Sequence, residues 1–162
     1  MQSPAPHMIH SLTAMMRIID KAEAHAAARN IKPEVIPNLR LIADMLPFWR
    51  QITIACDHAK GACGRLSGIE VPSFADAEMT LAELQDRIAK TIAFVEAIPH
   101  SAFDGAEARQ ITVKAGPREL SFAAPAYLLG FALPNFYFHL TTAYNILRSH
   151  GVAIGKGDFL GG

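Results

Sequence analysis

The sequence has 162 residues, of which 51% are hydrophobic and 19% are charged. This composition indicates one folded domain over residues 1–162 and argues against a disordered chain. The 15 Lys and Arg residues balance the 15 Asp and Glu residues, and no basic run is present, so nucleic acid and anionic membrane surfaces are poor partners. No apolar stretch approaches the roughly 20 residues that a transmembrane helix needs.

The first residues, MQSPAPHMIH, contain no basic segment followed by an apolar one, so we expect no signal peptide. The two cysteines, Cys56 and Cys63, are seven residues apart on a predicted helix. That spacing separates their Cα atoms by about 10 Å, which is too far for a disulfide. We expect both to be small buried residues in a reducing compartment, and the cytoplasm is the default location.

Two helices are predicted in the first part of the chain. Apolar side chains recur every three or four residues between residues 7 and 29, which predicts the first helix. Residues 30–47 contain several prolines, so we expect a long connection with a short helical turn. The second helix is predicted over residues 48–67, is rich in small residues, and is expected to stop at Gly68.

A capping motif marks the start of the third helix. Thr80 and Glu83 have the spacing of a capping box, and Met79 and Leu84 are placed as a hydrophobic staple. Pro99 is expected to end this helix. Its apolar positions are expected to face inward, and its charged side chains are expected on the solvent face: Glu83, Asp86, Arg87 and Lys90.

The hydrophobic period then changes from helical to alternating. Residues 109–122 alternate apolar and polar side chains around an Ala-Gly-Pro turn, which predicts a small β-hairpin that leans on the helices. A fourth helix is predicted from Pro125 to about His150. Four long helices with one short hairpin before the last predict an all-α fold, a four-helix bundle.

Polar residues interrupt the apolar fourth helix. Pro134 removes a backbone donor and pushes its ring toward the carbonyl of Gly130, which is the most permissive residue for such a kink. Asn135 and His139 are four residues apart and therefore share one face. On the second helix, His58 lies in line with apolar residues, so it too is expected to point into the bundle.

Two readings of these residues remain open. Neutral imidazoles are good ligands for zinc, nickel or iron(II), and helical bundles build metal sites from facing helices. A catalytic site takes three protein ligands, however, and the side-chain oxygen of Asn135 is a weak one. A lone inward-facing His is more often a core residue satisfied by a hydrogen bond, and His58 and His139 also fit that role.

Asp57 adjoins His58 in sequence, but adjacent helical residues diverge by about 100°, so we interpret it as a surface or interface carboxylate. Aromatic side chains project from nearly every side of the predicted fourth helix. One side must pack in the core, and the other must meet the hairpin or a second subunit, of which a homodimer is the simpler explanation. These aromatic residues are Tyr127, Phe131, Phe136, Tyr137, Phe138 and Tyr144.

Two blocks of the sequence, RLIADMLPFWRQITIACDHAKGA and LLGFALPNFYFHLTTAYNILRSHGVAIGKGDFLG, closely resemble a bacterial family defined as a domain of unknown function, number nineteen ninety-three. The likeness extends over nearly the whole chain. That family resembles a branch of the DinB/YfiT-like superfamily of metalloenzymes. The resemblance implies a DinB-like four-helix bundle that is often dimeric.

The resemblance also implies a set of candidate ligands. In the superfamily, one His on the second helix and an H-x-x-x-H motif on the last helix bind a divalent metal. Members with known activity include thiol-dependent S-transferases and a maleylpyruvate isomerase. His58 matches the first ligand and His139 the second His of the motif, whereas Asn135 stands where its first His is expected. The departure from the family pattern therefore falls on a metal ligand.

Three functional hypotheses follow. The chain is a divalent-metal enzyme acting on a small molecule, in a thiol-transferase-like reaction, with His58, His139 and Asn135 as ligands. Alternatively, it is a metal-free small-molecule-binding or stress-related protein without catalytic activity. In the third hypothesis, the three polar groups only specify the bundle. The absence of a third His favours the two metal-free hypotheses. The grouping of three polar residues beside Pro134 favours a pocket, which both the enzyme and the small-molecule-binding hypotheses require.

Overall fold

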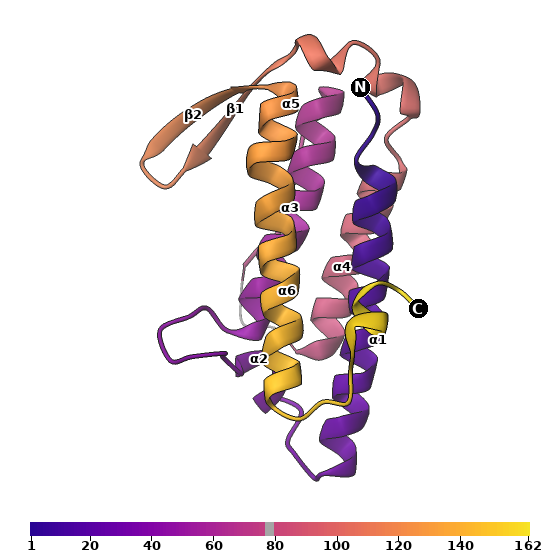
Figure 1. The fold of residues 1–162 in the computed structure, drawn as a ribbon, viewed down its shortest axis with the longest axis vertical. Helices are drawn as coiled ribbons and strands as arrows, with labels where there is room; N and C mark the ends of the chain where they lie inside the picture. Colours follow the sequence, from indigo (N-terminus) through magenta and orange to yellow (C-terminus); the bar gives the residue numbers. More distant parts are fainter. Residues whose placement is uncertain (77–79) are drawn as a thin grey trace.

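The computed structural model describes residues 1–76 and 80–162. Long helices form an elongated bundle in which α3 packs against α6 and α4, and α4 packs against α1 (Figure 1). The all-α fold with a hairpin before the last long helix is as predicted from the sequence. The long helices are α1 (Ala5–Ala28), α3 (Phe48–Ser67), α4 (Leu81–Glu96) and α6 (Leu133–Ser149).

Several helix ends match the sequence signals. Gly68 takes a left-handed conformation with φ of 76° and caps α3, where glycine avoids a steric penalty. Both bonds of the capping box at the start of α4 are present: the Glu83 amide donates to Thr80 Oγ1 at 3.2 Å, and the Thr80 amide donates to Glu83 Oε2 at 2.8 Å. The predicted staple of Leu84 involves Met79, which lies outside the described residues.

Short elements connect the long helices. The proline-rich connection after α1 contains one helical turn, α2 (Val35–Asn38), as expected. Two 3₁₀ turns, η1 (His100–Phe103) and η2 (Ala106–Ala108), lead from α4 to the hairpin. After α6, the chain returns along α1 and forms the short helix α7 (Lys156–Phe159). None of the helices in the described parts of the chain is long and apolar enough to cross a membrane.

The hairpin consists of β1 (Gln110–Ala115) and β2 (Arg118–Ala123), paired antiparallel. The inward-facing Ile111 pairs with Phe122, and Val113 pairs with Leu120. Ile111 and Val113 are buried, so one face of this otherwise marginal ribbon is held against other parts of the fold.

Apolar side chains from every long helix fill the core, among them Met8, Leu12, Ile52, Leu84 and Leu140. Both cysteines are fully buried and free, as predicted. Burial raises the pKa of Cys56 to about 12 and that of Cys63 to about 12. A thiol with such a pKa holds almost no thiolate at neutral pH, so these cysteines are packing residues rather than nucleophiles.

The last helix is more complex than the sequence suggests. It begins as α5 (Ala124–Tyr127), widens into a π-helical segment, η3 (Leu128–Ala132), and continues as α6. The π-helical segment lies immediately before Pro134, which has no amide hydrogen to donate to the ladder. A Cβ atom on Gly130 would have no neighbour within 4 Å outside its own helix backbone, so packing does not require glycine there.

One sequence prediction is wrong. Arg87 was expected on the solvent face of α4, but it is only 4% exposed. The reason is that the connection between α3 and α4 crosses over this position and supplies acceptors for the guanidinium group. The local helical pattern carries no sign of that crossing, because the acceptors come from outside the helix.

Candidate functional site

His58 on α3 and His139 on α6 face each other across the interface of these two helices. Their ring centroids are 6.0 Å apart, and the ring planes are inclined by only 15°. Both side chains are partly buried. The structure therefore brings together the two histidines that the helical spacing placed on inward faces.

A buried glutamine orients His139. Gln51 lies on α3, is 2% exposed, and donates its side-chain amide to the Leu46 carbonyl at 3.0 Å. Its Oε1 atom lies 2.7 Å from Nδ1 of His139. Because a carboxamide oxygen can only accept, Nδ1 must carry the proton in this bond. The neutral imidazole then has its free lone pair on Nε2.

The third predicted site residue, Asn135, makes a different contact. Its side-chain amide donates to the Phe131 carbonyl at 2.7 Å, one turn earlier on the same helix. This carbonyl belongs to the π-helical segment, where the regular ladder is interrupted. Asn135 thus supplies a donor to the backbone next to Pro134.

The environment keeps both imidazoles neutral. Burial lowers the pKa of His58 to about 4, and the neighbouring His139 adds to this effect. Burial also lowers the pKa of His139, with a further contribution from the positive charge of Arg50. At neutral pH the pair therefore offers uncharged hydrogen-bonding groups in a partly desolvated place.

Aromatic side chains form one wall beside His58. The Phe131 ring lies 5.7 Å from the His58 ring in an edge-to-face arrangement. Tyr127 follows at 6.0 Å from Phe131, and Phe122 of the hairpin lies 5.5 Å from Phe131. The Tyr127 hydroxyl accepts a hydrogen bond from Arg65 at 3.1 Å. The hairpin, the π-helical segment and α3 therefore all contribute to the surroundings of this imidazole.

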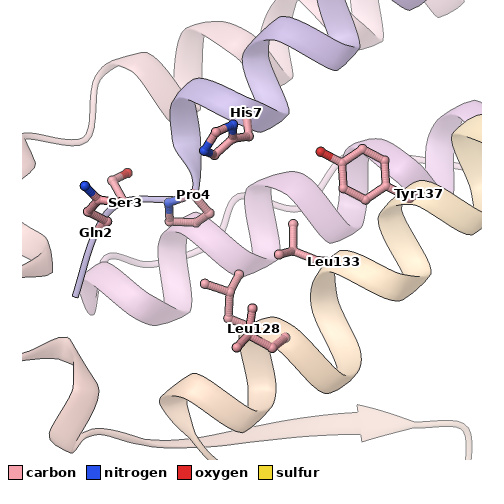
Figure 2. Close-up of a pocket in the computed structure, with 8 residues that line it drawn as sticks. Gln2, Ser3, Pro4, His7, Leu128, Leu133 and Tyr137 are labelled. Carbon is pink, nitrogen blue, oxygen red and sulfur yellow. The ribbon is translucent and has the colours of Figure 1, made fainter. Parts of the chain in front are cut away.

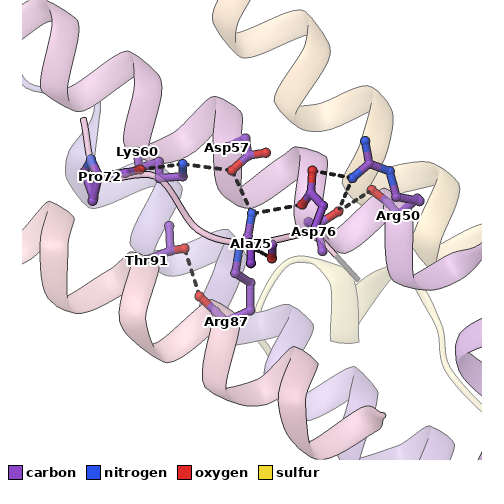
Figure 3. Close-up of polar contacts among 9 residues, drawn as sticks. Arg50, Asp57, Lys60, Pro72, Ala75, Asp76, Arg87 and Thr91 are labelled. Carbon is purple, nitrogen blue, oxygen red and sulfur yellow. Dashed lines mark hydrogen bonds and ion pairs between the residues drawn. The ribbon is translucent and has the colours of Figure 1, made fainter. Parts of the chain in front are cut away.

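An ion-pair network joins α3 and α4 to the segment that connects them (Figure 3). Asp57 pairs with Arg87 at 2.9 Å and with Lys60 at 3.0 Å. Asp76, on the crossing segment, pairs with Arg50 at 2.7 Å and with Arg87 at 3.5 Å. Asp57 is thus a half-exposed carboxylate at the interface of α3 and α4, where it pairs with two cations.

The cations of the same network also donate hydrogen bonds to the backbone of the crossing segment. Lys60 donates to the Pro72 carbonyl at 2.8 Å, and Arg87 donates to the Ala75 carbonyl at 3.0 Å. Phe74 lies against both cations, with Lys60 Nζ at 4.8 Å and Arg87 Cζ at 5.0 Å from its ring centroid. These contacts fix the segment against α3 and α4.

A separate pocket of about 360 Å³ lies between the start of α1 and the stretch from Leu128 to Tyr137 (Figure 2). Its lining includes His7 and Leu133 but neither His58 nor His139. Leu133 and Asn135 are two residues apart on α6, so they point to opposite sides of the helix. This pocket is therefore distinct from the histidine pair.

The sequence reasoning missed three residues of the site. Gln51 and Arg65 lie seven residues before and after His58, so both share its face of α3. That heptad spacing is visible in the sequence and was the available signal. Arg50, by contrast, acts on His139 through space, and no sequence spacing links these two residues.

The metal implied by the superfamily needs a matching donor set. The structure supplies two facing imidazoles, and Asn135 donates through its side-chain nitrogen to the Phe131 carbonyl, which leaves its oxygen as a weak ligand. No group of three His, Cys, Asp or Glu side chains able to hold a metal occurs within residues 1–76 and 80–162. Two imidazoles and one amide oxygen therefore do not match the three His, Cys or carboxylate ligands of a catalytic zinc centre.

One known protein family matches nearly the whole chain. A family model described as a domain of unknown function (DUF1993) matches residues 2–160. The chain belongs to this family. No curated protein matches it.

A solved structure extends the relationship to the fold. The chain is similar to the crystal structure of a DinB family member protein from Shewanella denitrificans, with a TM-score of 0.91 and 39% identity. The match covers 98% of this chain and 89% of that chain. The DUF1993 chain therefore has a DinB-like fold, as its sequence resemblance implied.

Proposed function

We propose that this DinB-like protein binds a small molecule between α3 and α6, with His58 and His139 as neutral hydrogen-bonding groups. The observation that carries the proposal is the near-parallel imidazole pair, with centroids 6.0 Å apart on the two helices. A tautomer with the proton fixed on Nδ1 presents the Nε2 lone pair of His139 to a bound molecule. Gln51 selects that tautomer.

Binding is favoured over acid–base catalysis by the pKa of His58. A general base works best when its pKa lies near the operating pH. Burial holds the pKa of His58 at about 4, so its neutral nitrogen is a weak base at neutral pH. Such a group is suited to donate and accept hydrogen bonds from a bound molecule without taking its proton.

A divalent-metal site is the second candidate function, and one observation favours it. The bond from His139 Nδ1 to Gln51 leaves Nε2 unprotonated, and metal-bound histidines commonly have their other nitrogen held in this way. In this candidate, zinc, nickel or iron would take two protein ligands, His58 and His139. Asn135 would remain with the Phe131 carbonyl.

The experiment for the proposed site is a ligand screen read at the histidines. Protein labelled with ¹⁵N-histidine, prepared free of metal, is mixed with a library of small polar and aromatic molecules. We expect at least one class of compound to shift the imidazole signals of both His58 and His139 and to lose affinity in His139→Phe. A His7→Phe variant is the matched control, because His7 lines the separate pocket.

Two outcomes would overturn the proposal. One is a library that shifts neither imidazole. The other is a set of ligands that bind equally well to wild type and to His139→Phe but fail with His7→Phe. The second result would place binding in the pocket between α1 and the π-helical segment.

A further inference from the structure

Arg65 has an unusual position on α3. It lies one heptad after His58, and its side chain folds back along its own helix across Gly61. A Cβ atom at Gly61 would collide with Nη1 of Arg65. Glycine at this position therefore leaves the guanidinium group room to lie against the helix on the His58 side.

Arg65 is also a cation without a compensating carboxylate. Within the described ranges 1–76 and 80–162, its side chain forms no ion pair, and its hydrogen bond goes to the neutral hydroxyl of Tyr127 at 3.1 Å. Its neighbours on α3 differ in this respect. Arg50 pairs with Asp76, and Lys60 pairs with Asp57. A partly buried guanidinium with free donors favours an anion as its partner.

A group of aromatic rings begins at Tyr127, the hydrogen-bond partner of Arg65. The Tyr127 ring is fully buried and contacts the Phe131 ring, which in turn meets the His58 ring. Phe122, from the hairpin, also contacts Phe131. Aromatic rings stack or meet edge to face with other rings at these spacings. Because Tyr127 is fully buried, Phe131 and Phe122, which are partly buried, are the rings of this wall that an aromatic or other planar apolar group can contact.

We propose that the site takes a small aromatic carboxylate, with Arg65 binding the carboxylate and the aromatic wall contacting the ring. This inference rests on the proposed small-molecule site and names the chemical class of its ligand. The planar guanidinium fork matches a carboxylate with two parallel hydrogen bonds, which a neutral amide cannot accept in the same way. His58, which is neutral, adds a hydrogen-bonding group without repelling the anion.

The test compares benzoate with benzamide, which has nearly the same shape and no charge. Affinities are measured by NMR titration of the ¹⁵N-histidine-labelled protein. We expect benzoate to bind at least tenfold more tightly than benzamide to wild type. We expect Arg65→Gln to abolish this preference. Arg148→Gln should retain it, because Arg148 is exposed at the far end of α6.

A second variant keeps the test decisive if Arg65→Gln folds poorly. Gly61→Ala preserves the charge and suits a helix, but its methyl group displaces the Arg65 guanidinium from its place. The benzoate preference should fall in this variant as well. Retention of the full preference in both Arg65→Gln and Gly61→Ala would contradict the inference.

The remaining outcomes separate this inference from the proposed function. Equal affinity of benzoate and benzamide, with shifts at His58 and His139, would overturn the anion preference and leave the small-molecule site intact. Binding of neither compound would overturn the aromatic-carboxylate inference. The proposed function would then be judged by the wider ligand library alone.

Discussion

At the scale of single residues, the hydrogen bond between Gln51 and His139 defines which nitrogen of the imidazole is free. Gln51→Leu removes this acceptor and also leaves the Leu46 carbonyl without its donor. We expect a loss of about 1–3 kcal/mol in the free energy of unfolding, because buried polar groups become unsatisfied. Urea unfolding measures the loss, and ¹⁵N spectra report the tautomer.

The spectra supply the decisive part of that measurement. In wild type, His139 should be a single tautomer protonated on Nδ1, and in Gln51→Leu it should become a mixture. An unchanged tautomer in the variant would mean that Gln51 does not orient the ring.

His58 makes the stability depend on pH. Its pKa in the folded protein is about 4, against 6.5 for an unperturbed histidine. Between these values the unfolded chain binds more protons than the folded one, so stability rises with pH and is lost as the pH falls from 6.5 toward 4. The contribution is about 2 kcal/mol after a discount for partial exposure to solvent.

A comparison of two proteins isolates this contribution. Urea unfolding of wild type and His58→Gln at pH 4.5 and 6.5 should give a smaller difference between the two pH values for the variant. Equal pH dependence in both proteins would show that His58 titrates normally in the folded state.

The sequence predicted correctly which way a side chain points where helical spacing alone determines it. His58 and His139 were placed on inward faces, and the structure brings their rings together. Asn135 was grouped with them because it shares the face of His139. Its side-chain nitrogen donates to the Phe131 carbonyl, and this bond depends on backbone geometry around Pro134 that a spacing rule does not contain.

At the scale of elements, Arg87 links α4 to α3 and to the segment that crosses both. We expect Arg87→Met to lower the free energy of unfolding by about 1–3 kcal/mol, because it leaves the Ala75 carbonyl without its donor and takes one of two cationic partners from Asp57 and from Asp76. Lys90→Met on the same helix is the matched control. Lys90 is exposed, so its replacement should change stability by less than about 0.5 kcal/mol.

Chemical denaturation of the two variants provides the measurement. Similar, small effects for Arg87→Met and Lys90→Met would show that the network adds nothing to stability. If Arg87→Met is more stable than wild type, the free energy lost by desolvating the Arg87 guanidinium exceeds the free energy gained from its ion pairs.

The elements themselves were largely predictable from local signals. The capping box of α4, the glycine cap of α3 and the alternating hairpin each depend on residues close in sequence, and each is present in the structure. The π-helical segment was missed because the missing donor of Pro134 can be accommodated in more than one way. The burial of Arg87 was missed because its partners come from another segment.

At the scale of the whole molecule, we propose that the chain forms a homodimer through the outward side of its last helix. Leu129 is 68% exposed, and it lines the pocket together with Leu128, Leu133 and Tyr137. An exposed apolar side chain beside an apolar hollow on the same surface suits the self-complementary contact of a twofold dimer. Sedimentation should give a dimer for wild type and a monomer for Leu129→Asp.

The control for this prediction is Ile42→Asp, because Ile42 is 61% exposed but lies in the connection before α3. This variant should remain a dimer. Wild-type protein that sediments as a monomer at its highest soluble concentration would contradict the dimer.

The most direct test of a small-molecule site that needs no metal is the metal content of the purified protein. The untagged chain is purified without chelator, and zinc, nickel, iron and manganese are quantified by mass spectrometry in wild type, His58→Ala and His139→Ala. The account predicts far less than one metal ion per chain in all three, even after soaking with each metal. A near-stoichiometric metal in wild type that is lost in both variants would contradict it and favour the two-histidine metal site.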